Sequence, residues 1–181
     1  MRKEGENGCT GLLRQQTKAK FITVATRLAA WTLKWCKDER LFTRRERWIV
    51  TGDLWAAAKG VLACAKKANL RRDFADAAQF AEREAYLRQA IDQLMEMEIL
   101  LTIKYEMVLQ GFNAAKQAAP PPEKSPAEEP TGKKAHRGGR KRLTMDDIDR
   151  IFEIFFTMTA EEKDLIRGLL DSDKERRAAV P

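Results

Sequence analysis

The sequence predicts an all-α protein: an up-down helical bundle of four helices, followed by a disordered Pro-rich basic linker and a C-terminal helical hairpin. Apolar residues recur at the three- and four-residue spacing of a helix face between positions 21 and 112. The alternating pattern of a β-strand is lacking. Five of the six prolines fall between positions 120 and 130, so they separate two helical regions.

These patterns divide the 181 residues into one domain with an appendage. We expect a flexible N-terminus at 1–16, a helical bundle at 17–113, a linker at 114–142, a helical hairpin at 143–172 and a tail at 173–181. No apolar run reaches the roughly 18 residues that a membrane span needs. Residues 1–10 lack the apolar block of a secretory signal, so we expect a cytoplasmic protein.

The first helix is expected from about Thr17 to Lys37. Its apolar stripe follows the i, i+4, i+7 and i+11 positions of one helix face and consists of Val24, Leu28, Trp31 and Trp35. A charged connection at 37–47 follows this helix and contains the apolar pair Leu41 and Phe42.

The second helix is expected from Arg44 to about Ala68. Thr43 and Glu46 form a T-x-x-E capping box, in which each side chain satisfies the other residue's backbone N–H, so the helix begins directly after Thr43. Gly52 and Gly60 each weaken this helix by up to about 1 kcal/mol. A glycine on a packed helix also permits the close approach of a neighbouring helix, and the sequence leaves both interpretations open.

The third helix, at 74–112, is predicted from the longest uninterrupted pattern in the chain, which has no proline and no glycine before Gly111. At 1.5 Å per residue it would reach about 58 Å, so it must bend, break or overhang the two shorter helices. Glu98 falls on its apolar stripe. Its carboxylate either reaches water at the edge of the stripe or pairs with a buried cation of the first two helices.

The part of the chain after the linker is predicted to form a helical hairpin. Thr144 with Asp147 gives one helix start signal and Thr159 with Glu162 gives a second, which places the break near Met158. Two short helices cannot bury the apolar surface of this segment between them, so the hairpin docks on the bundle, dimerises or binds another protein. The predicted partner-binding residues are Phe152, Phe155 and Phe156.

The residues that catalysis and metal binding require are missing from these patterns. The single histidine, His136, lies in the linker, so no folded site has an imidazole base beside a nucleophile. The three cysteines, Cys9, Cys36 and Cys64, are too far apart to chelate zinc, and they fit packing residues in a reducing compartment. We therefore expect no enzyme activity, no cofactor and no metal site.

Positive charge is the strongest functional signal of the sequence. There are 20 Lys and Arg against 14 Asp and Glu in residues 1–113, six against none in 133–142, and six against ten in 143–181. Such basic segments attract polyanions by releasing their counterions. We expect nucleic-acid contacts at Lys37, Arg40, Arg44, Arg45, Arg47, Lys66, Lys67, Arg71, Arg72, Lys133, Lys134, Arg137, Arg140, Lys141 and Arg142. Trp48 either stacks on an unpaired base or packs into the core.

Three segments carry a resemblance to a known family. A charged turn with an aromatic residue, Leu41 to Arg45, leads into RWIVTGDLWAAAKGVLACAKKANL at 47–70, and LRQAIDQLMEMEILLTIKYEM follows at 87–107. This order is similar to that of the accessory variability determinant (Avd) proteins of diversity-generating retroelements, and of the four-helix-bundle proteins encoded in ribosomal-RNA intervening sequences. The resemblance covers roughly 18–107. It implies a basic bundle that assembles as a pentamer and binds a reverse transcriptase and template RNA.

The family pattern ends after Met107, where no clear fourth helix follows. Either the C-terminal segment supplies that helix, or the third helix folds back near Tyr105. Two functional hypotheses remain. The first is a non-enzymatic, homo-oligomeric accessory protein that binds RNA, or DNA, and supports mutagenic reverse transcription. The alternative is a protein–protein scaffold whose C-terminal hydrophobic hairpin docks a partner.

Overall fold

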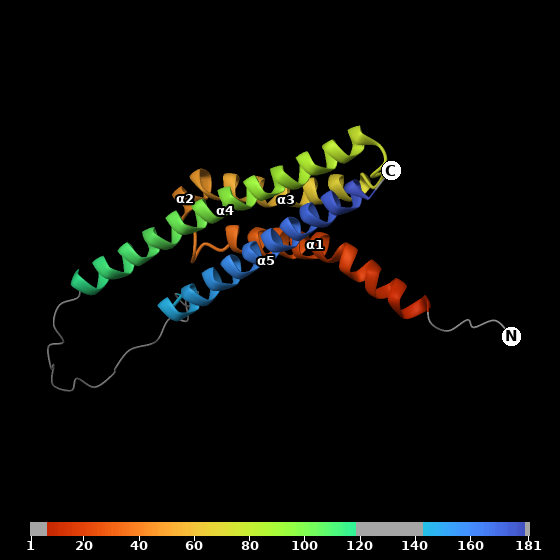
Figure 1. The fold of residues 1–181 in the computed structure, drawn as a ribbon. Coiled ribbons are helices and arrows are strands. Elements are labelled where there is room, and N and C mark those ends of the chain that lie inside the picture. Colours follow the sequence, from red (N-terminus) through yellow and green to blue (C-terminus); the bar gives the residue numbers. More distant parts are fainter. Residues whose placement is uncertain (1–6, 119–142, 180–181) are drawn as a thin grey trace, which may run out of the picture.

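The structure, a computed structural model, describes the backbone of residues 7–118 and 143–179. It also describes the burial of the side chains in 20–114, except that of Trp48, and in 143–179. In these ranges the protein is all-helical, as predicted, and contains no strand (Figure 1). The five helices are α1 (Asn7–Cys36), α2 (Arg44–Ile49), α3 (Thr51–Leu70), α4 (Ala77–Ala118) and α5 (Met145–Ala178).

The first helix begins earlier than predicted. α1 starts at Asn7, so most of the N-terminal stretch expected to be flexible is helical. The apolar stripe begins only near Phe21, but the residues before it include no proline, and Arg14, Gln15 and Gln16 have high helix propensity. The onset of an apolar stripe therefore marks where a helix packs, and not where it starts.

The predicted capping box at Thr43 is confirmed, while the helix after it is bent. The Thr43 hydroxyl accepts the Glu46 N–H at 3.4 Å, and the Thr43 N–H donates to Glu46 Oε2 at 2.8 Å. The expected single helix is divided into α2 and α3 at Val50. Thr51 Oγ1 donates to the carbonyl of Arg47, and such back-bonding bends helices. The N–H groups of Val50 and Leu54 still make helical hydrogen bonds, so the chain bends without ending its helix.

α4 is one unbroken helix of 42 residues. It begins after Asp76, whose carboxylate accepts the N–H groups of Ala78 and Gln79 at 2.8 and 3.3 Å. It reaches about 63 Å against about 30 Å for α3, so its C-terminal part extends beyond α3 (Figure 1). The third helix does not fold back near Tyr105.

The C-terminal segment is one helix, and the predicted hairpin is wrong. α5 runs without a break from Met145 to Ala178, through the expected turn and most of the expected tail. The Thr144–Asp147 capping box is confirmed at its start. Thr159 instead lies inside the helix, fully buried, and its hydroxyl donates to the Phe156 carbonyl at 2.9 Å. The two apolar patches therefore form one face of one helix, and that face packs on the rest of the protein.

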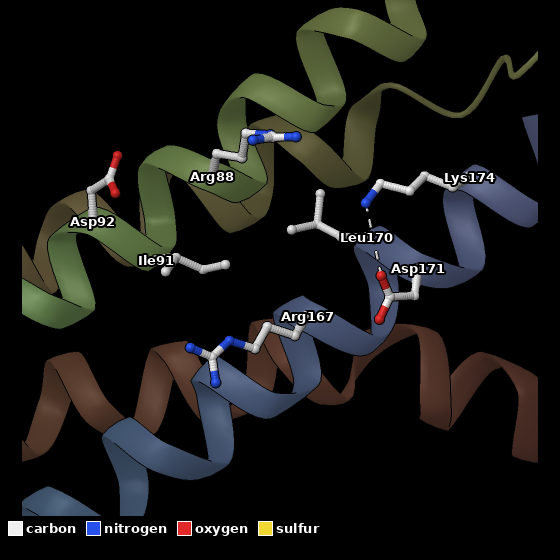
Figure 2. Close-up of a pocket in the computed structure, with 7 residues that line it drawn as sticks. All are labelled: Arg88, Ile91, Asp92, Arg167, Leu170, Asp171 and Lys174. Carbon is white, nitrogen blue, oxygen red and sulfur yellow. Dashed lines mark ion pairs between the residues drawn. The ribbon is translucent and has the colours of Figure 1, made fainter.

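The four long helices contact one another in a closed ring. α3 packs on α1 and α4, α5 packs on α4 and α1, and the short α2 contacts α3. Lys20 contacts Glu161 while Trp31 contacts Phe155, so α5 runs antiparallel to α1. Arg83 pairs with Asp173 while Glu98 pairs with Lys163, so α5 also runs antiparallel to α4. Arg167, Leu170 and other side chains of α5 face α4 across a shallow groove (Figure 2).

The structure also settles two open interpretations of single residues. A side chain at Gly52 would meet nothing within 4 Å, whereas a Cβ at Gly60 would lie 2.5 Å from Gln93 Oε1. Gly60 therefore leaves room for the Gln93 side chain of α4, and Gly52 only weakens α3. Glu98 is half-buried and pairs with Lys163 of α5 at 2.6 Å, so its partner lies on neither of the first two helices.

Candidate nucleic-acid interface

The first predicted basic site is a connection between α1 and α2 that is anchored by two apolar side chains. Leu41 and Phe42 are 3% and 0% exposed. Their N–H groups both donate to the carbonyl of Asp38, at 3.2 and 3.0 Å, which turns the chain tightly. Because the apolar pair is directed into the core, Lys37, Arg44 and Arg45 on either side of it are exposed.

An ion pair also attaches this connection to α4. Lys104, which is only 4% exposed, donates to Glu46 Oε1 at 2.7 Å, and its ammonium lies 5.3 Å from the centre of the Phe42 ring. Partial burial acts to raise the pKa of Glu46, but the hydrogen bonds from Lys104 and Thr43 outweigh it and lower that pKa. Glu46 is therefore ionised at neutral pH, and it holds the start of α2 in place.

Not all predicted cations of this connection are available to a polyanion. Arg40 forms a bidentate ion pair with Asp38, with nitrogen–oxygen distances of 2.6 to 3.2 Å. Arg47 forms an ion pair with Glu39 at 3.1 Å. Within the described residues, Lys37, Arg44 and Arg45 form no ion pair. These three cations, which we call the α1–α2 cations, are the ones best placed to contact phosphates.

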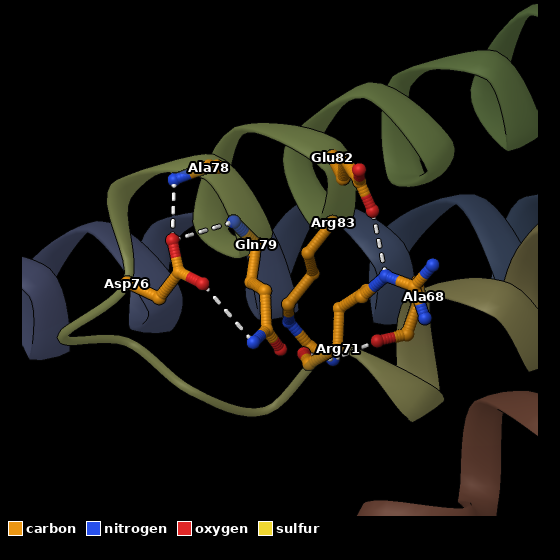
Figure 3. Close-up of polar contacts among 7 residues, drawn as sticks. All are labelled: Ala68, Arg71, Asp76, Ala78, Gln79, Glu82 and Arg83. Atoms are coloured by element: carbon orange, nitrogen blue, oxygen red, sulfur yellow. Dashed lines mark hydrogen bonds and ion pairs between the residues drawn. The ribbon is translucent and has the colours of Figure 1, made fainter.

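The second predicted site lies at the connection between α3 and α4. Lys66 and Lys67 are exposed on the last turn of α3, and Lys67 lies 5.3 Å from the centre of the Tyr86 ring. Arg71 pairs with Glu82 at 2.6 Å (Figure 3), and Arg72 donates to the carbonyl and side chain of Asn69. This site therefore offers fewer uncommitted cations than the sequence predicts.

A buried arginine holds this second connection together. Arg83 donates to the carbonyls of Ala68, at 2.5 Å, and Arg71, at 3.3 Å (Figure 3), which satisfies the end of α3. The same guanidinium pairs with Asp173 of α5, and both side chains are less than 10% exposed. Arg83 is not among the residues predicted from the sequence, although it lies four residues before Leu87 on the apolar stripe, where a polar residue needs a partner.

The end of α5 adds two arginines to this connection that sequence reasoning did not place here, and one of them, Arg176, also pairs with Asp173 at 3.7 Å. Arg177 donates to the carbonyls of Phe74 and Ala75 at 2.6 and 2.8 Å, and Arg176 lies 5.6 Å from the centre of the Phe74 ring. No local pattern indicates this contact, because it joins residues about a hundred positions apart.

The two basic connections lie at opposite ends of α3, about 30 Å apart (Figure 1). The structure therefore does not join them into one compact site. The side chain of Trp48 and the linker cations, Lys133, Lys134, Arg137, Arg140, Lys141 and Arg142, lie outside the described residues.

The predicted partner-binding aromatics are covered by the protein itself. Phe152 and Phe155 are 2% and 0% exposed, and half-buried Phe156 packs against the same core. The centres of the Phe152 and Tyr105 rings lie 5.1 Å apart, and those of the Phe155 and Trp31 rings lie 6.4 Å apart. Of the three open alternatives, docking on the other helices is the one found, and it covers Phe152 and Phe155.

Within residues 7–118 and 143–179, no cluster of three His, Cys, Asp or Glu side chains is arranged to hold a metal ion. None of the helices in those ranges combines the length and apolar character of a membrane span.

No model of a protein family matches the chain, and no curated protein or solved structure matches it. The resemblance to the Avd proteins therefore depends on the three quoted segments, and it stays a prediction.

Proposed function

We propose that this protein is a non-enzymatic accessory protein that binds nucleic acid through cations fixed at its helix connections. The observation that carries the proposal is the state of the α1–α2 cations. Lys37, Arg44 and Arg45 are exposed and unpaired within the described ranges, on a connection anchored by Leu41 and Phe42. Because the backbone of this connection is already held in place, only the side chains have to become ordered when they meet phosphates.

The mechanism is electrostatic. Phosphates displace counterions when they meet Lys and Arg side chains, so binding weakens as salt rises and depends little on base sequence. The cations at the two ends of α3 are too far apart for one phosphate group, so an extended RNA, or DNA, runs along the helices. The cations of 133–142 contribute a tethered basic arm.

The resemblance adds the biological setting to the proposal. The protein acts beside a diversity-generating retroelement in the cytoplasm, where it binds the reverse transcriptase and template RNA and supports mutagenic reverse transcription. It is a four-helix bundle whose fourth helix is α5, and it assembles as a homo-oligomer, a pentamer by resemblance.

The proposal is tested by replacing Lys37, Arg44 and Arg45 together with glutamine in the full chain. We expect weaker binding of a labelled single-stranded RNA and a salt slope, d log K/d log[salt], that is smaller by about 2. The measurement is fluorescence anisotropy between 50 and 300 mM salt. The matched control replaces Arg27, Arg150 and Arg167, which are exposed elsewhere and remove the same charge.

Equal losses in the control and the test variant would show that only net charge matters, and the α1–α2 cations would not be a site. Unchanged affinity and slope in the test variant would contradict the proposal directly. Circular dichroism of both variants shows whether the helices are retained.

A further inference from the structure

A row of large apolar side chains lies exposed along α4. Met95, Ile99, Ile103 and Met107 are 50, 59, 51 and 44% exposed. They follow one another at four-residue intervals, so they form a continuous ridge along three turns of the helix. Single exposed apolar residues are ordinary, whereas a contiguous row of four marks an interaction surface.

Beside this ridge, α4 and α5 enclose a groove. One hollow of about 390 Å³ is lined by Met95, Ile99 and Ile103 from α4 and by Lys163 and Arg167 from α5, among others. Arg167 also lines the next hollow along the two helices, of about 510 Å³, whose floor includes Ile91 and Leu170 (Figure 2). The ridge thus continues into a depression that can receive the side chains of a helix.

On α4 the charge beside the ridge is negative, in contrast to the protein as a whole. The cations that line the groove from α5 are each paired with a carboxylate: Lys163 with Glu98, Arg167 with Asp164 and Lys174 with Asp171. The exposed charged residues of α4 between 92 and 107 are Asp92, Glu96 and Glu106. The one cation of this stretch, Lys104, is buried against Glu46. The full chain carries a net charge of +7, so this acidic apolar face is a local feature. It repels the phosphates of a nucleic acid and favours a basic partner.

We propose that this face of α4 is a docking site for an amphipathic helix of a partner protein, with an apolar stripe flanked by Lys and Arg. The ridge supplies apolar anchors at the spacing that a helix lying in a groove uses, and the three carboxylates supply the charge complementarity. It is a site separate from the nucleic-acid contacts, and it stands whether or not the protein binds RNA.

A second copy of this chain fits the face poorly. If two α4 helices packed antiparallel about a twofold axis between Ile99 and Ile103, then Glu96 of one copy would face Glu106 of the other. Like charges placed opposite each other oppose association. The acidic flanks therefore select a basic helix over self-pairing.

The test uses a synthetic amphipathic Leu–Lys peptide of about 18 residues and the full-length protein. The control peptides are a Leu–Glu peptide with the same apolar stripe and a scrambled Leu–Lys peptide without one. We expect the Leu–Lys peptide to bind at least roughly tenfold tighter than either control, by fluorescence anisotropy at about 0.15 M salt.

Two double variants separate the apolar and charged contributions. Ile99→Gln with Ile103→Gln should weaken peptide binding roughly tenfold and leave RNA binding unchanged. Glu96→Gln with Glu106→Gln should reduce the salt dependence of peptide binding. Leu70→Gln is the matched control, because Leu70 is 72% exposed at the end of α3 and should not affect the peptide. Since all of these positions are exposed, the melting temperatures should stay close to that of the original protein.

Equal binding of the Leu–Glu peptide would overturn the proposal, as would full affinity of the Leu–Lys peptide for the Ile99/Ile103 variant. Sedimentation provides a further check. If the protein self-associates and the Ile99/Ile103 variant does not, the occupant is a second copy, and the proposed partner is wrong.

Discussion

Replacing Glu162 with glutamine removes a carboxylate that lies inside the core. Glu162 is 0% exposed, and neither of its carboxylate oxygens has a hydrogen-bond partner among the described residues. Desolvation by burial, followed by the negative charge of neighbouring Glu161, raises the pKa of Glu162 from 4.5 to about 8. Near neutral pH the buried side chain is therefore mostly protonated.

This shift makes the free energy of unfolding depend on pH. Because the pKa is higher in the folded than in the unfolded protein, the folded state binds more protons between pH 4.5 and 8. Stability is greatest below this window, falls by at most about 1.4 kcal/mol per pH unit as the pH rises through it, and stays low above it. The whole pKa shift lowers the free energy of unfolding by about 5 kcal/mol. Roughly 3 kcal/mol of this decrease has occurred by pH 7.

We expect Glu162→Gln to be more stable than the original protein by roughly 3 kcal/mol at pH 7 and by less than about 1 kcal/mol at pH 5. The assay is urea unfolding followed by circular dichroism at several pH values between 5 and 8.5. Glu153→Gln is the control, since Glu153 is exposed on the same helix and its replacement should add no such trend. A constant difference between Glu162→Gln and the original protein across this range would refute the reasoning.

Two further predictions concern the glycines of α3 and the buried ion pair between Arg83 and Asp173. Gly52→Ala should raise the free energy of unfolding by up to about 1 kcal/mol, because nothing lies within 4 Å of the new methyl group. Gly60→Ala should gain less, because its methyl group displaces the Gln93 side chain. Urea unfolding of both variants measures the difference, and a larger gain at Gly60 would contradict the role of Gly60 in making room for the Gln93 side chain. Asp173→Asn should cost about 3–5 kcal/mol by leaving Arg83 as an uncompensated buried charge. Adding Arg83→Met should recover part of that loss, and additive losses in this double-mutant cycle would argue against the pair.

Local signals in the sequence predict some helix boundaries well and fail at others. The T-x-x-E pattern is a true cap at Thr43 and is absent as a cap at Thr159, although the residue types are the same. Before Thr43 the chain turns, because Leu41 and Phe42 fix a tight connection. Before Thr159 the apolar residues continue at helical spacing, and their burial against α1 and α4 keeps the helix intact. Tertiary packing therefore decides whether a cap signal is used.

The candidate site shows the same division between local and distant information. The position of the cations around 37–47 follows from the sequence, because a charged connection between two helices must lie at a surface. The pairing of Arg40 with Asp38 is also local, since the two residues are two positions apart in the chain. The pair Arg83 and Asp173 joins positions that are 90 residues apart. It depends on the position of α5 relative to α4 along the helix axes, and the spacing of apolar residues in the sequence does not determine that position.

Several polar contacts between α4 and α5 depend on one particular alignment of the two helices. An apolar face that slips by one turn, about 5.4 Å, still meets an apolar face. The hydrogen bond from Tyr105 to Asp149, at 2.8 Å, and the pairs Lys163 with Glu98 and Arg83 with Asp173 would all be broken by that slip. Buried ion pairs often add little net stability, and we expect these pairs to favour the observed arrangement over a slipped one. Since Arg83 also holds the carbonyls at the end of α3, this alignment positions the α3–α4 connection and its exposed cations.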